Sequence, residues 1–157
     1  MSGVYYSAEK LSEELRLRRK DNKNFTVVFT NGCFDIIHPG HIHIIERSSS
    51  LGDLVIVGMN SDKSVRKIKG EGRPVMDEKS RAAVLAALKG VDYVMVFDEE
   101  TPERVISFIR PDVLVKGSEY KEKDIVGREA AGRIVRVEMK KGYSTTKIIQ
   151  KIKKADE

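Results

Sequence analysis

The chain has 157 residues, of which 40% are hydrophobic and 34% are charged, and its formal net charge is +5. This length suits one domain, 1–157, in which residues 1–24 form an N-terminal helix and a linker to the first strand. The single cysteine excludes an internal disulfide and a cysteine-rich zinc site. No apolar run approaches the ~20 residues that span a bilayer, and the N-terminus carries no apolar signal region, so a cytoplasmic chain without membrane contact is predicted.

The predicted elements alternate between helix and strand. In chain order they are a helix at 7–20, a strand at 25–30, a helix at 40–51, a strand at 54–59, an irregular polar connection at 60–74, a helix at 77–88, a strand at 93–97, a helix capped by Thr101 with Pro102 in its first position, strands at 113–116 and 134–137, and a helix at 144–154 capped by Ser144. This order predicts an α/β fold with a Rossmann-like, doubly wound sheet of five parallel strands. Ligands of such sheets bind at the carboxyl ends of the strands.

The stretch TNGCFDIIHPGH, residues 30–41, lies at such a carboxyl end. Free N–H groups and a partial positive charge at the start of the next helix attract phosphate, and Gly40 would let a phosphate approach the backbone closely. His38 and His41 would lie beside the same site, where imidazoles can donate hydrogen bonds to phosphate oxygens. Neither the P-loop pattern nor GxGxxG is present, so another kind of phosphate-binding loop is predicted.

Two segments carry a family resemblance. GCFDIIHPGH (32–41) matches the GxFDxxHxGH signature of the cytidylyltransferase-like nucleotidyltransferases, and STTKII (144–149) resembles the second signature of that superfamily, at a helix start. The runs KGEGRPV (69–75), PDVLVKGSEY (111–120) and GYSTTKIIQKI (142–152) resemble the adenylyltransferase domains of bacterial ADP-heptose synthases. The resemblance implies an HxGH-type nucleotidyltransferase.

The resemblance also implies a reaction. A phosphate oxygen of a sugar 1-phosphate, D-glycero-β-D-manno-heptose 1-phosphate, would attack the α-phosphorus of ATP in line, giving ADP-heptose and pyrophosphate. No covalent intermediate is expected, so the protein would act by positioning two anions and neutralising their charge. Mg²⁺ is expected to accompany ATP, bound mainly by phosphates and water. Family members are often dimers, so a homodimer is expected.

The site residues follow from the resemblance and from their places at strand ends and helix starts. The nucleotide-binding set is expected to comprise Thr30, Asn31, Gly32, Cys33, Phe34, His38, Gly40, His41, Lys116, Gly117, Ser144, Thr145 and Thr146. The acceptor-binding set is expected to comprise Lys67, Lys69, Arg81 and Glu119, and the catalytic set His38, His41 and Lys69. No metal ligand is assigned to the protein. Cys33 is expected to line the loop as a small residue, and Asp35 to accept hydrogen bonds from loop N–H groups and shape the turn.

Several alternatives stay open. A glycerol-3-phosphate cytidylyltransferase, or another small-substrate member of the superfamily, is less favoured because Met139 stands where the glycerol enzymes carry an arginine. A zinc site built from the three histidines lacks a further ligand. A basic nucleic-acid-binding module would explain the charge but not the absence of aromatic residues among the basic ones, so no nucleic-acid partner is expected. Lys67 and Lys69 lie in a charged run, which a solvated surface would also explain.

Overall fold

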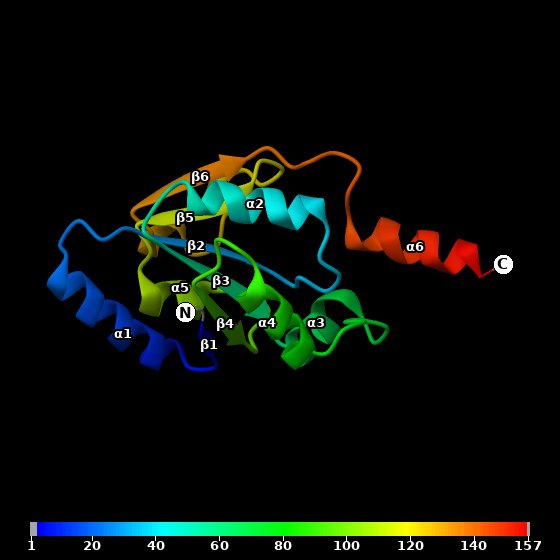
Figure 1. Ribbon diagram of the computed structural model, residues 1–157, viewed down its shortest axis with the longest axis horizontal. Coiled ribbons are helices and arrows are strands. Elements are labelled where there is room, and N and C mark those ends of the chain that lie inside the picture. The colour runs from blue at the N-terminus through cyan, green and yellow to red at the C-terminus, as the bar shows by residue number, and fades with distance from the viewer. Residues whose placement is uncertain (1–2, 157) are drawn as a thin grey trace.

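The computed structural model describes residues 3–156, in which six parallel strands form one sheet with helices on both faces (Figure 1). The predicted α/β, Rossmann-like architecture is confirmed. The elements are β1 (Gly3–Tyr5), α1 (Ala8–Asp21), β2 (Val27–Gly32), α2 (Pro39–Ser49), β3 (Leu54–Asn60), α3 (Asp62–Lys69), α4 (Glu78–Ala87), β4 (Tyr93–Phe97), α5 (Glu103–Ile109), β5 (Val113–Gly117), the 3-10 turns η1 (Glu122–Asp124) and η2 (Arg128–Ala130), β6 (Arg133–Val137) and α6 (Thr145–Ala155).

The sheet buries both of its faces. Successive strand residues point to opposite sides, so Phe29 of β2 packs with α1 and α5, whereas its neighbour Val28 packs with α2 and α4. The central strands are therefore mostly apolar, and every residue of β3 and β4 is buried. Within residues 3–156, no helix is long and apolar enough to cross a membrane.

The strand order β1-β4-β3-β2-β5-β6 places a topological switch point between β2 and β5. β2 pairs with β3 over its full length but with β5 only at Val28–Val113 and Phe29–Leu114. The two strands thus separate before their carboxyl ends. Asn31, the fifth residue of β2, and Lys116, the fourth residue of β5, lie beyond the last paired residues. Such a crevice is where open α/β sheets bind their ligands.

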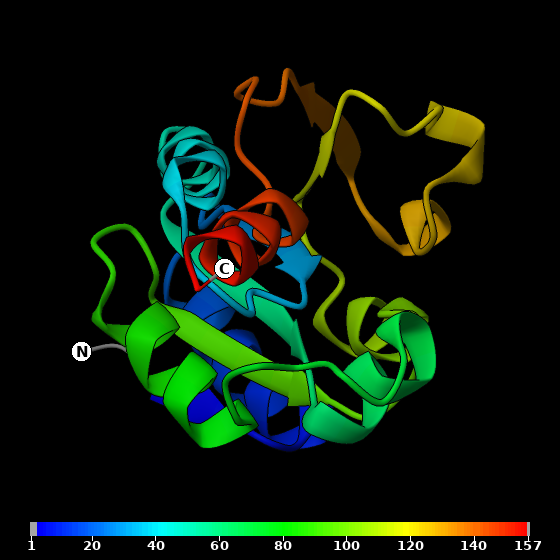
Figure 2. The ribbon, with the colours of Figure 1, turned by 90° about the vertical axis from the view of Figure 1, so that its right-hand side faces the viewer.

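Helix α6 lies beyond this end of the sheet. Figure 1 shows it projecting away from the strands, and Figure 2 shows it end-on, in front of their carboxyl ends. Ser144 caps it as predicted, accepting a hydrogen bond from the N–H of Lys147 at 3.1 Å. The cap therefore defines where α6 begins.

Three predictions about elements were wrong. Residues 1–24 contain the strand β1, which pairs with β4 and raises the strand count to six. The connection 60–74 contains α3, whose N-cap Ser61 accepts a hydrogen bond from Ser64 N. Thr101 does not cap α5, because Pro102 occupies the N-cap position without a side-chain hydrogen bond. A three-residue strand carries too little pattern to detect, and the basic run of α3 favoured a solvated loop.

Candidate active site

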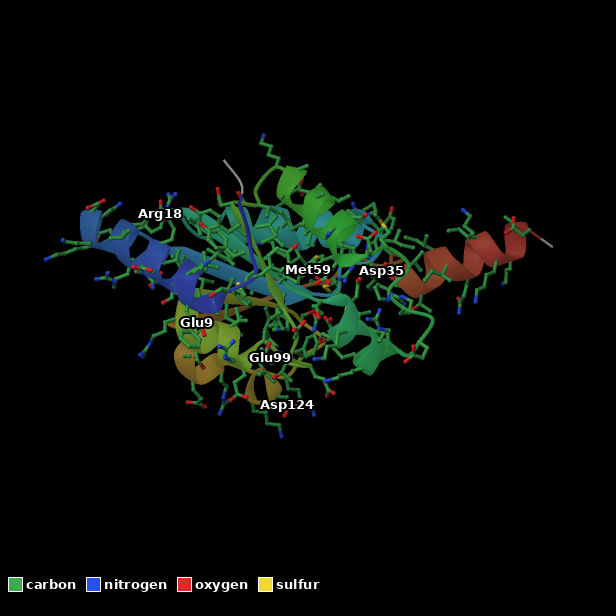
Figure 3. All side chains as sticks on the ribbon, turned by 90° about the horizontal axis from the view of Figure 1, so that it is seen from below. Glu9, Arg18, Asp35, Met59, Glu99 and Asp124 are labelled. Atoms are coloured by element: carbon green, nitrogen blue, oxygen red, sulfur yellow. The ribbon has the colours of Figure 1, made fainter. Side chains whose placement is uncertain are left out.

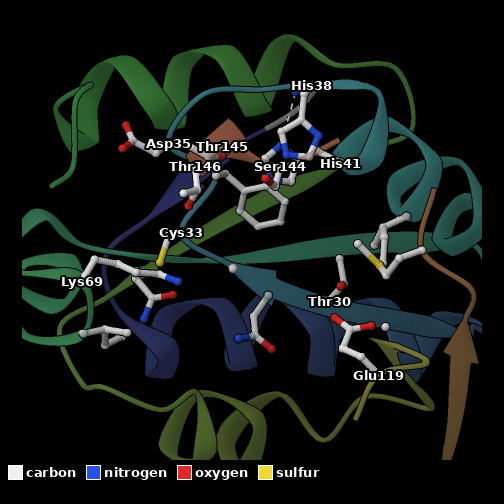
Figure 4. Close-up of a pocket in the computed structure, with 18 of the residues that line it drawn as sticks. Thr30, Cys33, Asp35, His38, His41, Lys69, Glu119, Ser144, Thr145 and Thr146 are labelled. Atoms are coloured by element: carbon white, nitrogen blue, oxygen red, sulfur yellow. Dashed lines mark hydrogen bonds between the residues drawn. The ribbon is translucent and has the colours of Figure 1, made fainter. Parts of the chain in front are cut away.

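A cavity of about 490 Å³ opens at the carboxyl ends of the central strands. It joins segments that lie far apart in the chain, namely the loop between β2 and α2, the end of β5 and the start of α6 (Figure 4). Among the residues that line it are fourteen of those predicted for the site: Thr30, Asn31, Gly32, Cys33, Phe34, His38, His41, Lys69, Lys116, Gly117, Glu119, Ser144, Thr145 and Thr146. Residues of both signature segments thus line the same cavity.

The two motif histidines form the N-terminal cap of α2. His38 is the N-cap residue, and its Nδ1 accepts a hydrogen bond from Gly40 N at 3.1 Å, while Nδ1 of His41 accepts one from His38 N at 3.3 Å. The two rings stack, with their centroids 3.8 Å apart. Because each Nδ1 is an acceptor, each neutral ring carries its proton on Nε2, and that N–H remains to donate to a ligand.

Both imidazoles are held in the neutral form. Burial lowers the pKa of His38, and burial together with the charge of a protonated His38 lowers the pKa of His41 to about 4. Two stacked imidazolium ions would repel each other in a site with little solvent. Near neutral pH the pair therefore presents two fixed Nε2–H dipoles to the cavity rather than two positive charges.

The low pKa of His41 gives a stability test. Between about pH 6.5 and pH 5 the unfolded chain binds a proton at this residue that the folded chain does not, so the free energy of unfolding should fall as the pH falls. For one group the unfolding equilibrium constant changes by at most about tenfold per pH unit. Urea unfolding of the wild-type protein and of His41→Asn, measured across this range, should give a flatter dependence for the variant. Equal slopes would contradict the low pKa.

Backbone geometry brings the histidines to the crevice. Phe34 has a φ of 49°, the left-handed conformation, which is uncommon for an aromatic residue and turns the chain sharply after β2. Its ring is buried beside that of His41, with 5.1 Å between the centroids. Gly40 does not line the cavity, and a Cβ on it would lie 2.9 Å from Cε1 of His38. The glycine therefore makes room for the capping imidazole.

The β5 side of the crevice carries a half-buried lysine. Nζ of Lys116 hydrogen-bonds to Oδ1 of Asn31 and lies 5.6 Å from the ring centroid of Tyr120. Burial lowers its pKa to about 8, against the opposing effect of Glu119. Lys116 thus bridges the two strands that part at the switch point, beside Glu119 and Tyr120 of the loop that follows β5.

The opposite side of the crevice carries Lys69, Cys33 and Asp35 (Figure 4). Asp35 lies near the end of the sheet from which α6 projects (Figure 3). As predicted, its carboxylate accepts hydrogen bonds from loop N–H groups, those of Val75 and Met76, and it also forms an ion pair with Arg73. Burial raises the pKa of the Cys33 thiol, outweighing the nearby cations, so Cys33 is a protonated lining residue.

Two predicted acceptor-binding residues do not line the cavity. Lys67 lies exposed on α3. The structure disagrees with the prediction for Arg81, whose side chain is fully buried. Its guanidinium donates to the carbonyls of Cys33, Asn60 and Met76 and pairs with Asp62, so the guanidinium joins the ends of β2 and β3 to α3 and α4 instead of facing a ligand.

The cavity also includes residues that were not predicted for the site from the sequence, namely Ile44, Asn60, Ile68, Arg73, Glu100, Met139 and Tyr143. Asn60 could have been found, because it ends a buried strand at the carboxyl edge of the sheet. The place of Arg73 depends on a loop whose path no local pattern specifies. Within residues 3–156, no group of three or more His, Cys, Asp or Glu side chains is placed to hold a metal ion.

The sequence of this chain is similar to that of known proteins. A family model described as cytidylyltransferase-like matches residues 29–151. The bifunctional protein HldE of Campylobacter jejuni subsp. doylei is 53% identical over 146 residues, which cover 92% of this chain and 31% of that protein. HldE of Helicobacter pylori strain P12 is 47% identical, with 93% of this chain and 30% of that protein covered. The chain therefore spans about a third of the length of these curated relatives.

Two solved structures share the fold. The lipopolysaccharide core biosynthesis protein from Thermoplasma volcanium superposes with a TM-score of 0.64 at 29% identity, covering 74% of this chain and 98% of that one. The pantoate-beta-alanine ligase from Francisella tularensis, complexed with beta-gamma ATP and beta-alanine, also gives 0.64, over 98% of this chain and 77% of that one. At 15% identity, the second likeness shows the fold alone.

Proposed function

Because this chain belongs to the cytidylyltransferase-like family, we propose that it transfers the adenylyl group of ATP to a heptose 1-phosphate, giving ADP-heptose and pyrophosphate. The observation that carries the proposal is the meeting of two helix starts, α2 and α6, and the stacked pair His38 and His41 on one cavity at the switch point. Helix starts attract phosphate, and two separate ones suit a chain of phosphates better than a single group.

The geometry supports in-line transfer without a covalent intermediate. In the proposed complex the Nε2–H groups of His38 and His41 donate to the phosphates around the α-phosphorus. The hydroxyls of Thr145 and Thr146 and the N–H groups of the first turn of α6 hold the leaving pyrophosphate. The two Nε2–H groups are fixed before substrate binds, because each Nδ1 accepts a backbone hydrogen bond, so little reorganisation of these donors accompanies the transfer of charge to the leaving oxygen.

The nucleoside and the acceptor are assigned to opposite sides of the crevice. Glu119, in the loop after β5, and Lys69 lie on opposite sides of the cavity (Figure 4). Lys116 and Gly117, at the end of β5, are proposed to hold adenosine together with that loop, and Lys69 is proposed to hold the acceptor phosphate. Identity near 50% to the HldE relatives, over nearly the whole chain, supports a heptose 1-phosphate as the acceptor. Mg²⁺ is proposed to enter with ATP, coordinated by phosphates and water, and to neutralise the triphosphate.

A competition assay tests the base and the acceptor together. ATP and CTP are supplied at equal concentration with D-glycero-β-D-manno-heptose 1-phosphate and, in a separate reaction, with glycerol 3-phosphate. ADP-heptose and pyrophosphate are expected as the dominant products, quantified by anion-exchange chromatography. Faster formation of CDP-glycerol would instead assign the chain to the glycerol-3-phosphate cytidylyltransferases. Omitting Mg²⁺ should abolish turnover, and adding it back should restore it.

A further inference from the structure

The cavity contains an arginine whose orientation is fixed by a buried carboxylate. Nε of Arg73 lies 2.7 Å from Oδ2 of Asp35, whose side chain is fully buried, while the side chain of Arg73 is 17% exposed. Asp35 also accepts hydrogen bonds from Val75 N at 2.8 Å and Met76 N at 2.9 Å. One carboxylate therefore fixes both the guanidinium and the backbone of the loop that carries it.

The Asp35 carboxylate is ionised at neutral pH. Burial alone would raise the pKa of Asp35, but the N–H groups of Met76 and Val75 and the charge of Arg73 together hold it below its usual value. The pairing occupies only one of the guanidinium nitrogens. Within residues 3–156, the two terminal nitrogens of Arg73 make no hydrogen bond, and the residue lines the cavity. An arginine held at Nε presents these two nitrogens as a fork that matches two oxygens of a phosphate.

The position of Arg73 indicates which phosphate it would contact. Arg73 pairs with Asp35, which lies on the same side of the crevice as Lys69 (Figure 4), and the charges of both cations act to lower the pKa of the Cys33 thiol. Lys69 and Glu119 lie on opposite sides of the cavity (Figure 4). The anchor Asp35 belongs to the same loop as His38, three residues earlier, so the arginine and the histidines are fixed relative to each other.

We propose that Arg73 binds the phosphate of the acceptor substrate through its two terminal nitrogens, together with Lys69, and that Asp35 acts as the positioning residue for it. This inference rests on the proposed function and adds a residue that fixes the attacking oxygen. An acceptor phosphate bound to this fork lies next to the phosphates held by His38 and His41. A rigid loop between the two groups maintains the in-line geometry.

The experiment compares Arg73→Gln and Arg73→Lys with the matched control Arg66→Gln, an exposed arginine of α3 outside the cavity. Apparent KM values are measured for ATP and for D-glycero-β-D-manno-heptose 1-phosphate. Binding of the sugar phosphate is measured by isothermal titration calorimetry with an ATP analogue present whose α,β-bridging oxygen is replaced by a methylene group, so that no adenylyl group is transferred. Thermal unfolding reports whether the loop is intact.

For Arg73→Gln we expect kcat/KM for the sugar phosphate to fall at least ~30-fold, with the KM for ATP changed less than ~3-fold, because a charge-assisted bidentate contact is lost. Arg73→Lys should recover only part of the loss, since a lysine supplies charge without the fork. Arg66→Gln should match the wild type.

Retention by Arg73→Gln of wild-type affinity for the sugar phosphate would overturn the inference and leave the proposed function intact. Equal increases in both KM values, with a lower unfolding temperature, would overturn it in favour of a purely structural role. A wild-type protein that neither binds nor adenylylates the sugar phosphate would overturn both.

Discussion

Replacement of His41 by alanine is expected to lower turnover at least ~10²-fold. In the structure Nε2–H of His41 is fixed by the hydrogen bond that Nδ1 accepts from His38 N, and the ring lines the cavity at a helix start. Loss of one preorganised donor of this kind costs about 2.7–4 kcal/mol of transition-state stabilisation in comparable oxyanion sites. Because the donor acts on charge that develops during transfer, kcat should fall more than the KM for ATP rises.

Two further variants separate the donor from the helix cap. His41→Asn keeps an acceptor in the place of Nδ1, and so can preserve the capping box, but it lacks the distal N–H. It should be about as inactive as His41→Ala. His43→Ala removes a histidine of the same helix that does not line the cavity, and it should retain wild-type turnover. Wild-type turnover in His41→Asn would remove the distal nitrogen from the mechanism.

The GxFDxxHxGH motif identified most of the site because the features that position its histidines are close together in the sequence. A strand end, a sharp turn and a helix start place His38 and His41 relative to one phosphate, and all three features are encoded within residues 30–41. The second signature was assigned for the same reason, since Ser144 both caps α6 and marks a helix start. The meeting of the two segments follows from the parallel sheet, whose strand ends share one edge.

The errors involve interactions that no local pattern specifies. Arg73 and Arg81 each follow a stretch with charged residues, and nothing in their neighbours shows that one guanidinium lines the cavity and the other is buried. The difference arises from distant partners: the buried carboxylate of Asp35 fixes one, whereas the carbonyls at the ends of β2 and β3 surround the other. α3 was missed although Ser61 and Asp62 form a capping start, because the basic run after them suggested a solvated loop.

Arg81→Ala is expected to lower the free energy of unfolding by about 3–5 kcal/mol, the range for breaking a buried ion pair by removing one partner. The guanidinium donates to Cys33 O, Asn60 O and Asp62 Oδ1 at 2.7 Å each and to Met76 O at 3.0 Å. Its loss leaves three carbonyls and a carboxylate without their donor. Two of the carbonyls flank the site, because Cys33 precedes the left-handed Phe34 and Asn60 ends β3.

Urea unfolding measures the effect, with Lys79→Ala as the matched control. Lys79 is exposed on the same helix, and its replacement should change the free energy of unfolding by no more than about 0.5 kcal/mol. Arg81→Lys keeps the charge without the planar fork, cannot serve four acceptors in one plane, and should recover little of the loss.

Kinetic measurements on the folded fraction of Arg81→Ala distinguish a structural role of Arg81 from direct contact with substrate. If Arg81 only holds the strand ends and helices together, its loss should displace the histidine loop and lower kcat, with similar changes in both KM values. If the Arg81→Ala protein is stable and only its KM for the sugar phosphate rises tenfold, this structural role would be contradicted and Arg81 would instead contact the substrate directly.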